Sequence, residues 1–285
     1  MKLRREKTTI IIALVIAAIV GLSGGSAIAA NRLILPGGVY YHRFASTVNA
    51  VEGIWTNPAA LGQGSMIRFL FIGEYANDEL AKNWGGVISG DRIGMGYRRL
   101  DNLDGSRYEE YTFGTGSGVG RNTFIGGSYT YVKQAAGIYN KKHLWNVGFM
   151  MASSPQMKIG IVFSNLNKNR VDGEKTDIEE LYAISYRPQS LPLWFSVEIG
   201  LSTGQSLSSA DYTYGIEGSP FKNWHGYASY KNGGYFEIGL TFFLDDYLGG
   251  AQTRFNKDGD HFGTSLYGGY FYHPKDDPQN YFPFK

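Results

Sequence analysis

From residue 65 almost to the C-terminus, apolar and polar residues alternate one by one in segment after segment. In Leu193–Leu201, apolar side chains occupy every odd position, while Ser196 and Glu198 lie between them. The segment 236–242 repeats the same period of two. Successive side chains of a strand point to opposite faces, so this period predicts half-buried β-strands.

The pattern predicts an all-β protein with about fourteen strands, and it supports a range of twelve to fourteen. An even number is expected when both termini lie on one side of a barrel. The predicted strands are 65–75, 82–89, 91–100, 106–115, 122–132, 143–153, 156–165, 177–187, 192–202, 210–218, 222–231, 234–244, 246–257 and 260–273.

The connections between the predicted strands alternate in length. Gly90-Asp91, Ser154-Pro155 and Ser219-Pro220 are terse, whereas 133–142 and 165–176 are longer and charged. Short turns at one end and longer polar loops at the other are typical of outer-membrane barrels. We therefore predict a transmembrane antiparallel up-and-down β-barrel over residues 65–273.

Three features favour a barrel in lipid over a water-soluble fold. An export signal begins the chain, the predicted strands approach the ~9–11 residues of a tilted span, and aromatic residues gather at strand ends, as in headgroup girdles. A soluble β-sandwich or a periplasmic barrel remains the alternative, because alternation alone does not exclude it. The strand-end aromatic residues are Trp84, Tyr97, Tyr111, Trp145, Tyr186, Trp194, Trp224, Tyr230, Tyr247 and Tyr272.

Residues 1–29 have the three parts of a secretory signal peptide. Basic residues at positions 2–7 precede an apolar run over 8–20, and Ala27-Ile28-Ala29 forms a small-x-small cleavage site. An uncleaved anchor is the alternative, although the run is shorter than the ~20 residues of a helical span.

The chain contains no cysteine, which excludes a lipid-anchored export signal, disulfides and thiolate metal sites. We expect the outer membrane of a Gram-negative-type bacterium, with outer-membrane lipid around the barrel.

Charge and histidine placement argue against several classes of site. The formal net charge is +2 and basic residues do not cluster along the chain, so no nucleic-acid partner is expected. The five histidines lack metal-ligand spacing. His225 with Ser229, or Asp260 with His261, are the candidate catalytic pairs, and neither has a visible third member to orient the base. We expect no cofactor, no metal and no enzymatic activity.

The residues between the signal and the first strand, 30–64, form a further segment. A helix is predicted over 46–52, where Ser46 could cap the first turn, and Asn57-Pro58 would end helical structure. A segment of this kind is expected to fold back into the periplasmic mouth of the barrel as a hatch. At the other end, the last strand is expected to finish near Tyr272, and 274–285 is a polar tail, so either Tyr272 or Phe284 closes the barrel.

The stretch 51–62, VEGIWTNPAALG, resembles the Asn-Pro-Ala element near the mature N-terminus of the FadL-like superfamily of outer-membrane barrels. The resemblance implies a fourteen-stranded barrel with an N-terminal hatch, and it carries over to Asn57, Pro58 and Ala59 as hatch residues near a ligand. The superfamily's classical transporters have large extracellular loops, whereas the predicted loops here are short.

Two functions from different classes follow from this resemblance. One is passive passage or binding of small hydrophobic or amphipathic molecules. The other is a non-conducting scaffold that docks a periplasmic or secreted partner protein.

Charged residues at inward positions of the alternating strands would line the lumen. They are expected to pair with one another and with the hatch, because an unpaired buried charge is costly; a selectivity-setting ring is the alternative. Glycines on the wall either admit bends or let an inner segment approach closely. The predicted lumen residues are Arg68, Glu74, Lys158, Glu198 and Glu237, with Lys231.

Overall fold

The computed structural model describes residues 44–48, 51–64, 67–76, 79–101, 107–134, 140–171, 174–219, 221 and 223–271. The predicted signal peptide at 1–29, the first part of the predicted hatch at 30–43 and the predicted tail at 274–285 lie outside the described residues. Tyr272 and Phe284 lie outside them as well.

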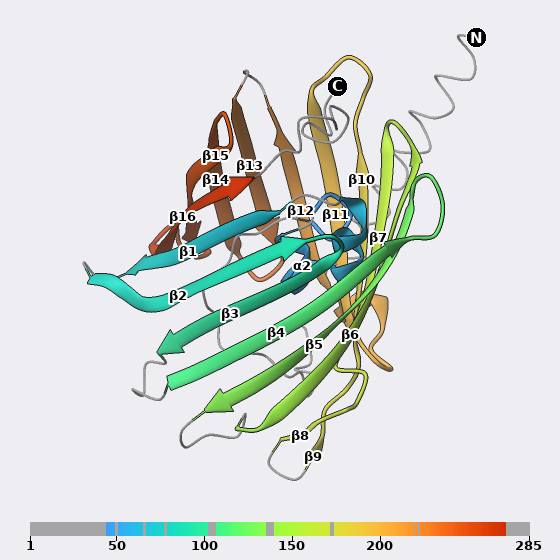
Figure 1. Ribbon diagram of the computed structural model, residues 1–285, viewed down its shortest axis with the longest axis vertical. Helices are drawn as coiled ribbons and strands as arrows, with labels where there is room; N and C mark the ends of the chain where they lie inside the picture. The colour runs from blue at the N-terminus through green and yellow to red at the C-terminus, as the bar shows by residue number, and fades with distance from the viewer. Residues whose placement is uncertain are drawn as a thin grey trace.

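Fourteen antiparallel strands form one closed barrel (Figure 1). They are β1 (Arg68–Ala76), β2 (Glu79–Gly90), β3 (Ile93–Asp101), β4 (Arg107–Gly118), β5 (Thr123–Gln134), β6 (Lys142–Ser154), β7 (Met157–Ser164), β10 (Glu179–Tyr186), β11 (Leu193–Ser202), β12 (Asp211–Gly218), β13 (Trp224–Lys231), β14 (Tyr235–Leu244), β15 (Tyr247–Phe255) and β16 (His261–Phe271). Each strand pairs with its neighbours in chain order, and β1 closes the ring on β16 with Arg68 opposite Phe271. The predicted all-β barrel is confirmed, and each of the fourteen predicted ranges overlaps one of the barrel strands.

Side chains on each strand alternate between the inside and the outside of the barrel. On β1, Leu70 and Ile72 are 0% exposed, whereas their neighbours Phe69 and Phe71 are 44% and 45% exposed. The alternation found in the sequence is therefore a division between the barrel interior and its outer surface. Apolar residues therefore lie on both sides of the barrel wall. Those that point inward are buried in the interior, and those that point outward form the surface that faces hydrocarbon.

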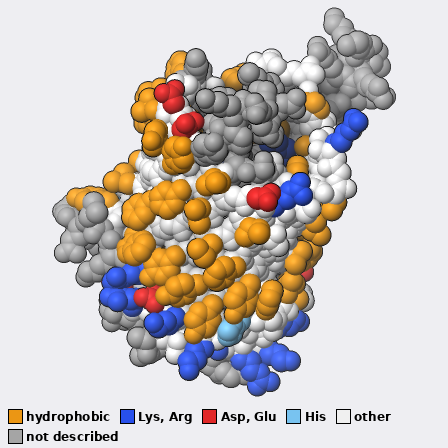
Figure 2. Space-filling model, in the orientation of Figure 1, with side chains coloured by type: hydrophobic (Ala, Val, Ile, Leu, Met, Phe, Trp, Pro, Cys, Tyr) orange, Lys and Arg blue, Asp and Glu red, His pale blue; other side chains and the backbone are white. Residues whose placement is uncertain are grey.

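Exposed apolar side chains cover much of the outer surface, and they form a broad band on the face shown in Figure 2. Across β2 to β5, Trp84, Tyr97, Tyr111 and Tyr131 stand side by side, with successive ring centroids 5.0, 5.2 and 6.4 Å apart. We call these four residues the aromatic row. Such rings prefer the boundary between hydrocarbon and headgroups. No helix within the described residues is long and apolar enough to cross a membrane.

The two ends of the barrel differ in their connections. At one end, tight turns such as Asp91-Arg92 join β2 to β3, with φ of 45° and 70°, the left-handed conformation that matches the twist of a two-residue hairpin. At the other end, the connection 165–178 between β7 and β10 is long enough to carry its own hairpin, β8 (Arg170–Val171) with β9 (Glu174–Lys175). We call these the turn end and the loop end, and in outer-membrane barrels the longer loops are extracellular.

Residues 44–48 and 51–64, which we call the inner segment, lie inside the barrel (Figure 1). The helix predicted over 46–52 is displaced: α2 spans Gly53–Thr56 and is followed by a 3-10 helix, η1, over Pro58–Gln63. Residues 45–47 form a turn, and 49–50 lie outside the described residues. Ser46 does not cap a helix, because its hydroxyl meets that of Ser185 on the barrel wall, 2.6 Å away.

Candidate functional site in the barrel interior

Asn57 holds the inner segment together and ties it to the wall. It is fully buried and extended, with φ −151° and ψ 103°, and it separates α2 from η1. Its amide nitrogen donates to the carbonyl oxygens of Ala45 at 2.8 Å and Phe149 at 3.1 Å. Its amide oxygen accepts from the N–H of Ala59 at 3.1 Å and so caps η1, where Pro58 supplies the first residue. Asn57 thus joins both parts of the inner segment to β6.

Glycines on the wall allow the backbone of the inner segment to lie directly against the strands. A Cβ on Gly126 of β5 would lie 2.2 Å from the carbonyl oxygen of Pro58, and one on Gly160 of β7 would lie 2.3 Å from that of Ala45. A Cβ on Gly148 of β6 would lie 2.1 Å from the side-chain oxygen of Asn57. No side chain fits at these distances, so these glycines admit the inner segment and do not merely relieve curvature.

A second anchor fixes the beginning of the inner segment to β10 and β11. The N–H of Ala45 donates to the carboxylate of Glu198 at 2.6 Å, and Glu198 is 5% exposed. Beside it, the hydroxyls of Ser46, Ser185 and Ser196 form a chain with separations of 2.6 Å. A charge-assisted bond to a backbone N–H is strong in a buried setting. Glu198, predicted as a lumen residue, is thereby engaged with the inner segment.

Four further predicted lumen residues, Arg68, Glu74, Lys158 and Glu237, also lie at inward positions. Glu74 pairs with Arg254 at 2.6 Å and accepts from Asn83 at 2.8 Å. Glu237 accepts from Gln252 at 3.3 Å. Arg68 lies over the Phe271 ring, 5.6 Å from its centroid, and Lys158 lies over the Trp194 ring, 4.7 Å from its centroid. Together with Glu198 they lie on four strands, with Arg68 and Glu74 both on β1, and none of the five lines the cavity described below.

An apolar cluster links the inner segment to the opposite wall. Val51, Ile54 and Leu61 of the inner segment belong to one buried cluster with wall residues from eight strands, β1 to β6, β15 and β16. Trp55 and Phe243, which are partly buried, pack against it. Its wall members are Leu70, Ile72, Val87, Leu100, Tyr108, Val132, Leu144, Leu248, Tyr267 and Phe271. The interior beside the inner segment is therefore apolar over much of its width.

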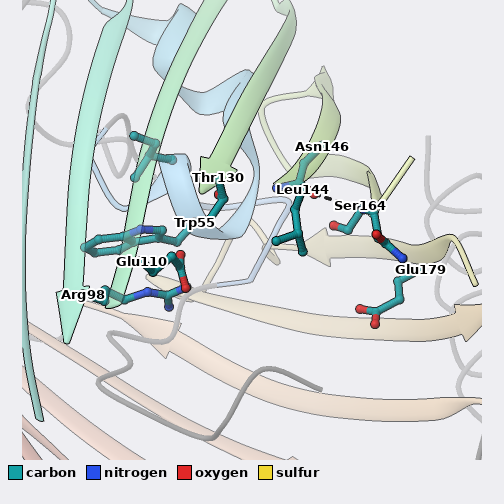
Figure 3. Close-up of a pocket in the computed structure, with 10 residues that line it drawn as sticks. Trp55, Arg98, Glu110, Thr130, Leu144, Asn146, Ser164 and Glu179 are labelled. Carbon is teal, nitrogen blue, oxygen red and sulfur yellow. Dashed lines mark hydrogen bonds and ion pairs between the residues drawn. The ribbon is translucent and has the colours of Figure 1, made fainter. Parts of the chain in front are cut away.

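A cavity of about 120 Å³ lies at the edge of this cluster (Figure 3). Ile54 and Trp55 of α2 and Leu144 of β6 supply its apolar lining. Its polar lining consists of Arg98, Glu110, Thr130, Asn146, Ser164, Asn165 and Glu179. The cavity thus combines one aromatic and two aliphatic side chains with charged and amide groups.

An ion pair forms one side of the cavity. Arg98 on β3 and Glu110 on β4 stand opposite each other, and one guanidinium nitrogen donates to both carboxylate oxygens at 2.6 and 2.8 Å. The carboxylate also accepts from the Thr112 hydroxyl at 3.1 Å. The Arg98 guanidinium lies over the Trp55 ring, 4.9 Å from its centroid. Arg98 therefore connects α2 to the wall and places a cation beside an aromatic ring.

The opposite side of the cavity is held by amides from the loop-end connection. Asn165 begins this connection and is 1% exposed. Its amide nitrogen donates to the Thr176 hydroxyl at 2.6 Å and the Asp177 carbonyl at 2.8 Å. Its backbone N–H donates to Asn146 at 3.2 Å. Asn165 is thus held by the connection it begins, and its backbone N–H in turn bonds Asn146 on β6.

None of the residues that line this cavity is among the site residues predicted from the sequence. Asn57, Pro58 and Ala59 are two to four residues away from it along the chain and pack against β5 and β6 instead. One signal was available: Arg98 and Glu110 carry opposite charges at inward positions of adjacent strands. Using that signal requires the β3–β4 register, and alternation alone does not provide it.

The two candidate catalytic histidines, His225 and His261, lie in different surroundings. His225, 3% exposed, lies 3.8 Å from the Glu217 carboxylate and 3.4 Å from the Ser219 hydroxyl. His261 is exposed and contacts the Thr264 hydroxyl at 2.9 Å, while Asp260 contacts Asn256. Within the part of the chain that the structure describes, no three His, Cys, Asp or Glu residues are grouped as a metal site requires.

Comparison with known proteins gives similarity at the level of fold. No protein-family model matches the sequence. No curated protein matches it either. Among solved structures, the monoaromatic hydrocarbon channel CymD superposes with a TM-score of 0.52 at 12% identity, covering 80% of this chain and 95% of that chain. The toluene transporter TodX of Pseudomonas putida superposes with a TM-score of 0.51 at 9% identity, covering 87% and 99%. The closed barrel, its apolar outer band and these superpositions identify an outer-membrane β-barrel.

Proposed function

We propose that this outer-membrane barrel binds small amphipathic molecules in its interior and allows their passive passage. The observation that carries the proposal is the cavity between α2 and β3–β6, where Trp55 lies beside the Arg98–Glu110 ion pair. The fold similarity to a monoaromatic hydrocarbon channel and a toluene transporter supports the same class of cargo.

The size and lining of the cavity favour a molecule with one ring and a polar group. A dry cavity of ~150 Å³ accepts benzene, and the cavity here measures about 120 Å³. A pure hydrocarbon would leave Asn146 and Glu179 facing apolar atoms, which costs the hydration of those groups. A hydroxyl or amide on the cargo would form hydrogen bonds with them instead.

The inner segment acts, in this proposal, as a hatch that closes the turn end. Asn57 and Pro58 contribute by fixing it to β5 and β6, while Ile54 and Trp55 face the cargo. A molecule would enter from the loop end, bind in the cavity and leave when the inner segment shifts or through the wall. The amide group of Asn57 already has two donor bonds and one acceptor bond within the protein, which favours an anchoring role.

The test is uptake of a small amphipathic aromatic probe, p-cresol, into liposomes that contain the purified protein. We expect faster uptake than into protein-free liposomes, with saturation as the probe concentration rises. Equal rates in the two preparations would refute passage, and absence of saturable binding to the protein in detergent would refute the binding site.

Replacing Trp55 with alanine is expected to weaken p-cresol binding roughly three- to tenfold, the value of one aromatic pair. The matched control is Trp84→Ala, which removes the same side chain from the outer surface of β2 and should leave binding unchanged. Binding is measured by equilibrium dialysis of the detergent-solubilised protein. Equal losses in both variants would mean that Trp55 acts through general stability and not through the ligand.

A second function, a non-conducting scaffold for a periplasmic partner, is favoured by one observation. The inner segment is anchored at both Ala45 and Asn57 and is buried over most of its length. Under this reading, a stoichiometric partner protein should co-purify after mild detergent extraction, and p-cresol uptake should match that of empty liposomes. The two results together separate scaffold from channel.

A further inference from the structure

The outer surface at the loop end carries basic side chains that the proposed function does not use. On the outward faces of β3 to β5, Arg99 stands opposite Glu109, and Glu109 stands opposite Lys133. Arg107 stands opposite Asp101 in the next outward position. The patch consists of Arg99, Arg107, Lys133, Lys141, Lys168 and Arg170, which we call the basic patch.

The strand register sets the height of the basic patch relative to the membrane. Arg99, Glu109 and Lys133 each lie two residues from Tyr97, Tyr111 and Tyr131 of the aromatic row, on the same face and towards the loop end. Two residues of a strand span ~6.6–6.8 Å. If the aromatic row marks the edge of the hydrocarbon, the basic patch lies at the level of lipid phosphates.

The loop-end connection adds to the same surface. Asn167 and Asn169 both donate to the backbone carbonyl of His143, at 2.5 and 2.6 Å, which holds residues 167–169 against the outer end of β6. Lys142 donates to the carbonyl of Arg170. Lys168 and Arg170 are thereby brought beside Lys141, and all three are exposed. Figure 2 shows Lys and Arg side chains gathered below the apolar band at the loop end.

Positive charge exceeds negative charge across the basic patch. Asp101 and Glu109 are the carboxylates paired with its β3–β5 members, at separations of 3.5 to 3.6 Å. Lys133 and Arg107 remain 62% and 52% exposed despite these pairs, so their cationic groups are accessible from the side. An accessible surplus of cations beside a lipid-facing aromatic row is complementary to anionic headgroups.

We propose that the basic patch binds the phosphate groups of an anionic glycolipid in the leaflet at the loop end. The apolar outer faces of β3 to β6 would contact the acyl chains of the same molecule, and the aromatic row would lie at its ester and sugar level. The partner is a lipid and not a free phosphate compound, because the cations and the apolar band form one continuous surface (Figure 2).

The test uses a bis-phosphorylated glucosamine glycolipid and its dephosphorylated form, each added to the detergent-solubilised protein and quantified by native mass spectrometry. Each basic side chain near an anionic surface strengthens binding roughly fivefold. Because Asp101 and Glu109 offset part of this gain, we expect Arg107→Gln/Lys133→Gln/Lys168→Gln to bind the phosphorylated lipid at least ~10-fold more weakly. The dephosphorylated lipid should bind weakly to the wild type and equally weakly to the variant.

The matched control removes three exposed cations elsewhere, Arg92→Gln/Arg121→Gln/Lys257→Gln, and should retain the affinity of the wild type. The charge-retaining variant Arg107→Lys/Lys133→Arg/Lys168→Arg should retain most of it. Equal binding of both lipids by the wild type, or an equal loss in the control, would overturn the proposal. Displacement of the lipid by the same concentration of a soluble bis-phosphorylated sugar would also overturn it, because the site would then recognise phosphate without the acyl chains.

Discussion

Gly126→Ala is expected to release the inner segment from the barrel wall while the barrel itself still forms. The added Cβ would lie 2.2 Å from the Pro58 carbonyl oxygen and 2.7 Å from the Ala59 nitrogen. Both are backbone atoms, which cannot rotate away as a side chain can. Overpacking usually costs ~1–3 kcal/mol, and a clash with backbone is expected at or above the upper end of that range.

The measurement uses the absence of cysteine from the native chain. A single Ser46→Cys reporter, at a position that is 0% exposed, should react with a maleimide slowly in the parent and much faster with Gly126→Ala. The control is Gly127→Ala on the same strand, where the new Cβ would point outward, 3.5 Å from its nearest neighbour. Equal reactivity in the two glycine variants would show that the inner segment does not depend on contact at Gly126.

Asn57→Asp should destabilise the inner segment more than Asn57→Ala. Alanine leaves the Ala45 and Phe149 carbonyls and the Ala59 N–H without this partner, and each lost partner in a buried site costs ~1–3 kcal/mol. Aspartate keeps the cap on Ala59 but turns a carboxylate oxygen towards two carbonyl oxygens, in a position with no solvent access. We expect a loss of about 3 kcal/mol or more for alanine and a larger loss for aspartate.

Thermal unfolding of the detergent-solubilised variants measures stability, and swelling of liposomes in a small sugar measures opening of the barrel. Both Asn57 variants should lower the temperature at which the protein begins to unfold, and both should increase the swelling of the liposomes. The control is Gln63→Ala, because Gln63 makes longer contacts of 3.3 Å to the Val48 carbonyl and the Met150 sulfur and is partly exposed. If Gln63→Ala matched Asn57→Ala in both measurements, Asn57 would have no special anchoring role.

The strands could be predicted from the sequence because a barrel wall has only two sides. The segment predicted over 192–202 became β11 at Leu193–Ser202, and its alternating residues divide between the interior and the outer surface. The helix predicted over 46–52 was misplaced for the opposite reason. Residues 44–48 bond to Glu198 and Ser185 from distant parts of the chain and to Asn57 of the inner segment, and these contacts outweigh a weak local helix preference.

The basic patch was missed because it is not a cluster in the sequence. Arg99 and Lys133 belong to β3 and β5, and only the strand register places them on either side of Glu109. The cavity was missed for a related reason, since it is lined by α2, six barrel strands and the start of one loop. Sites of this kind depend on strand register, that is, on which residues of neighbouring strands stand opposite each other.

Alternation and turn residues in the sequence were enough to determine an all-β barrel with its two unlike ends, because those properties arise from neighbouring residues along one strand or turn. The position of the inner segment, the glycines that admit it and the Arg98–Glu110 pair beside Trp55 were decided by closure of the ring. Closure fixes the register of every strand at once, and register determines which side chains face each other across the interior.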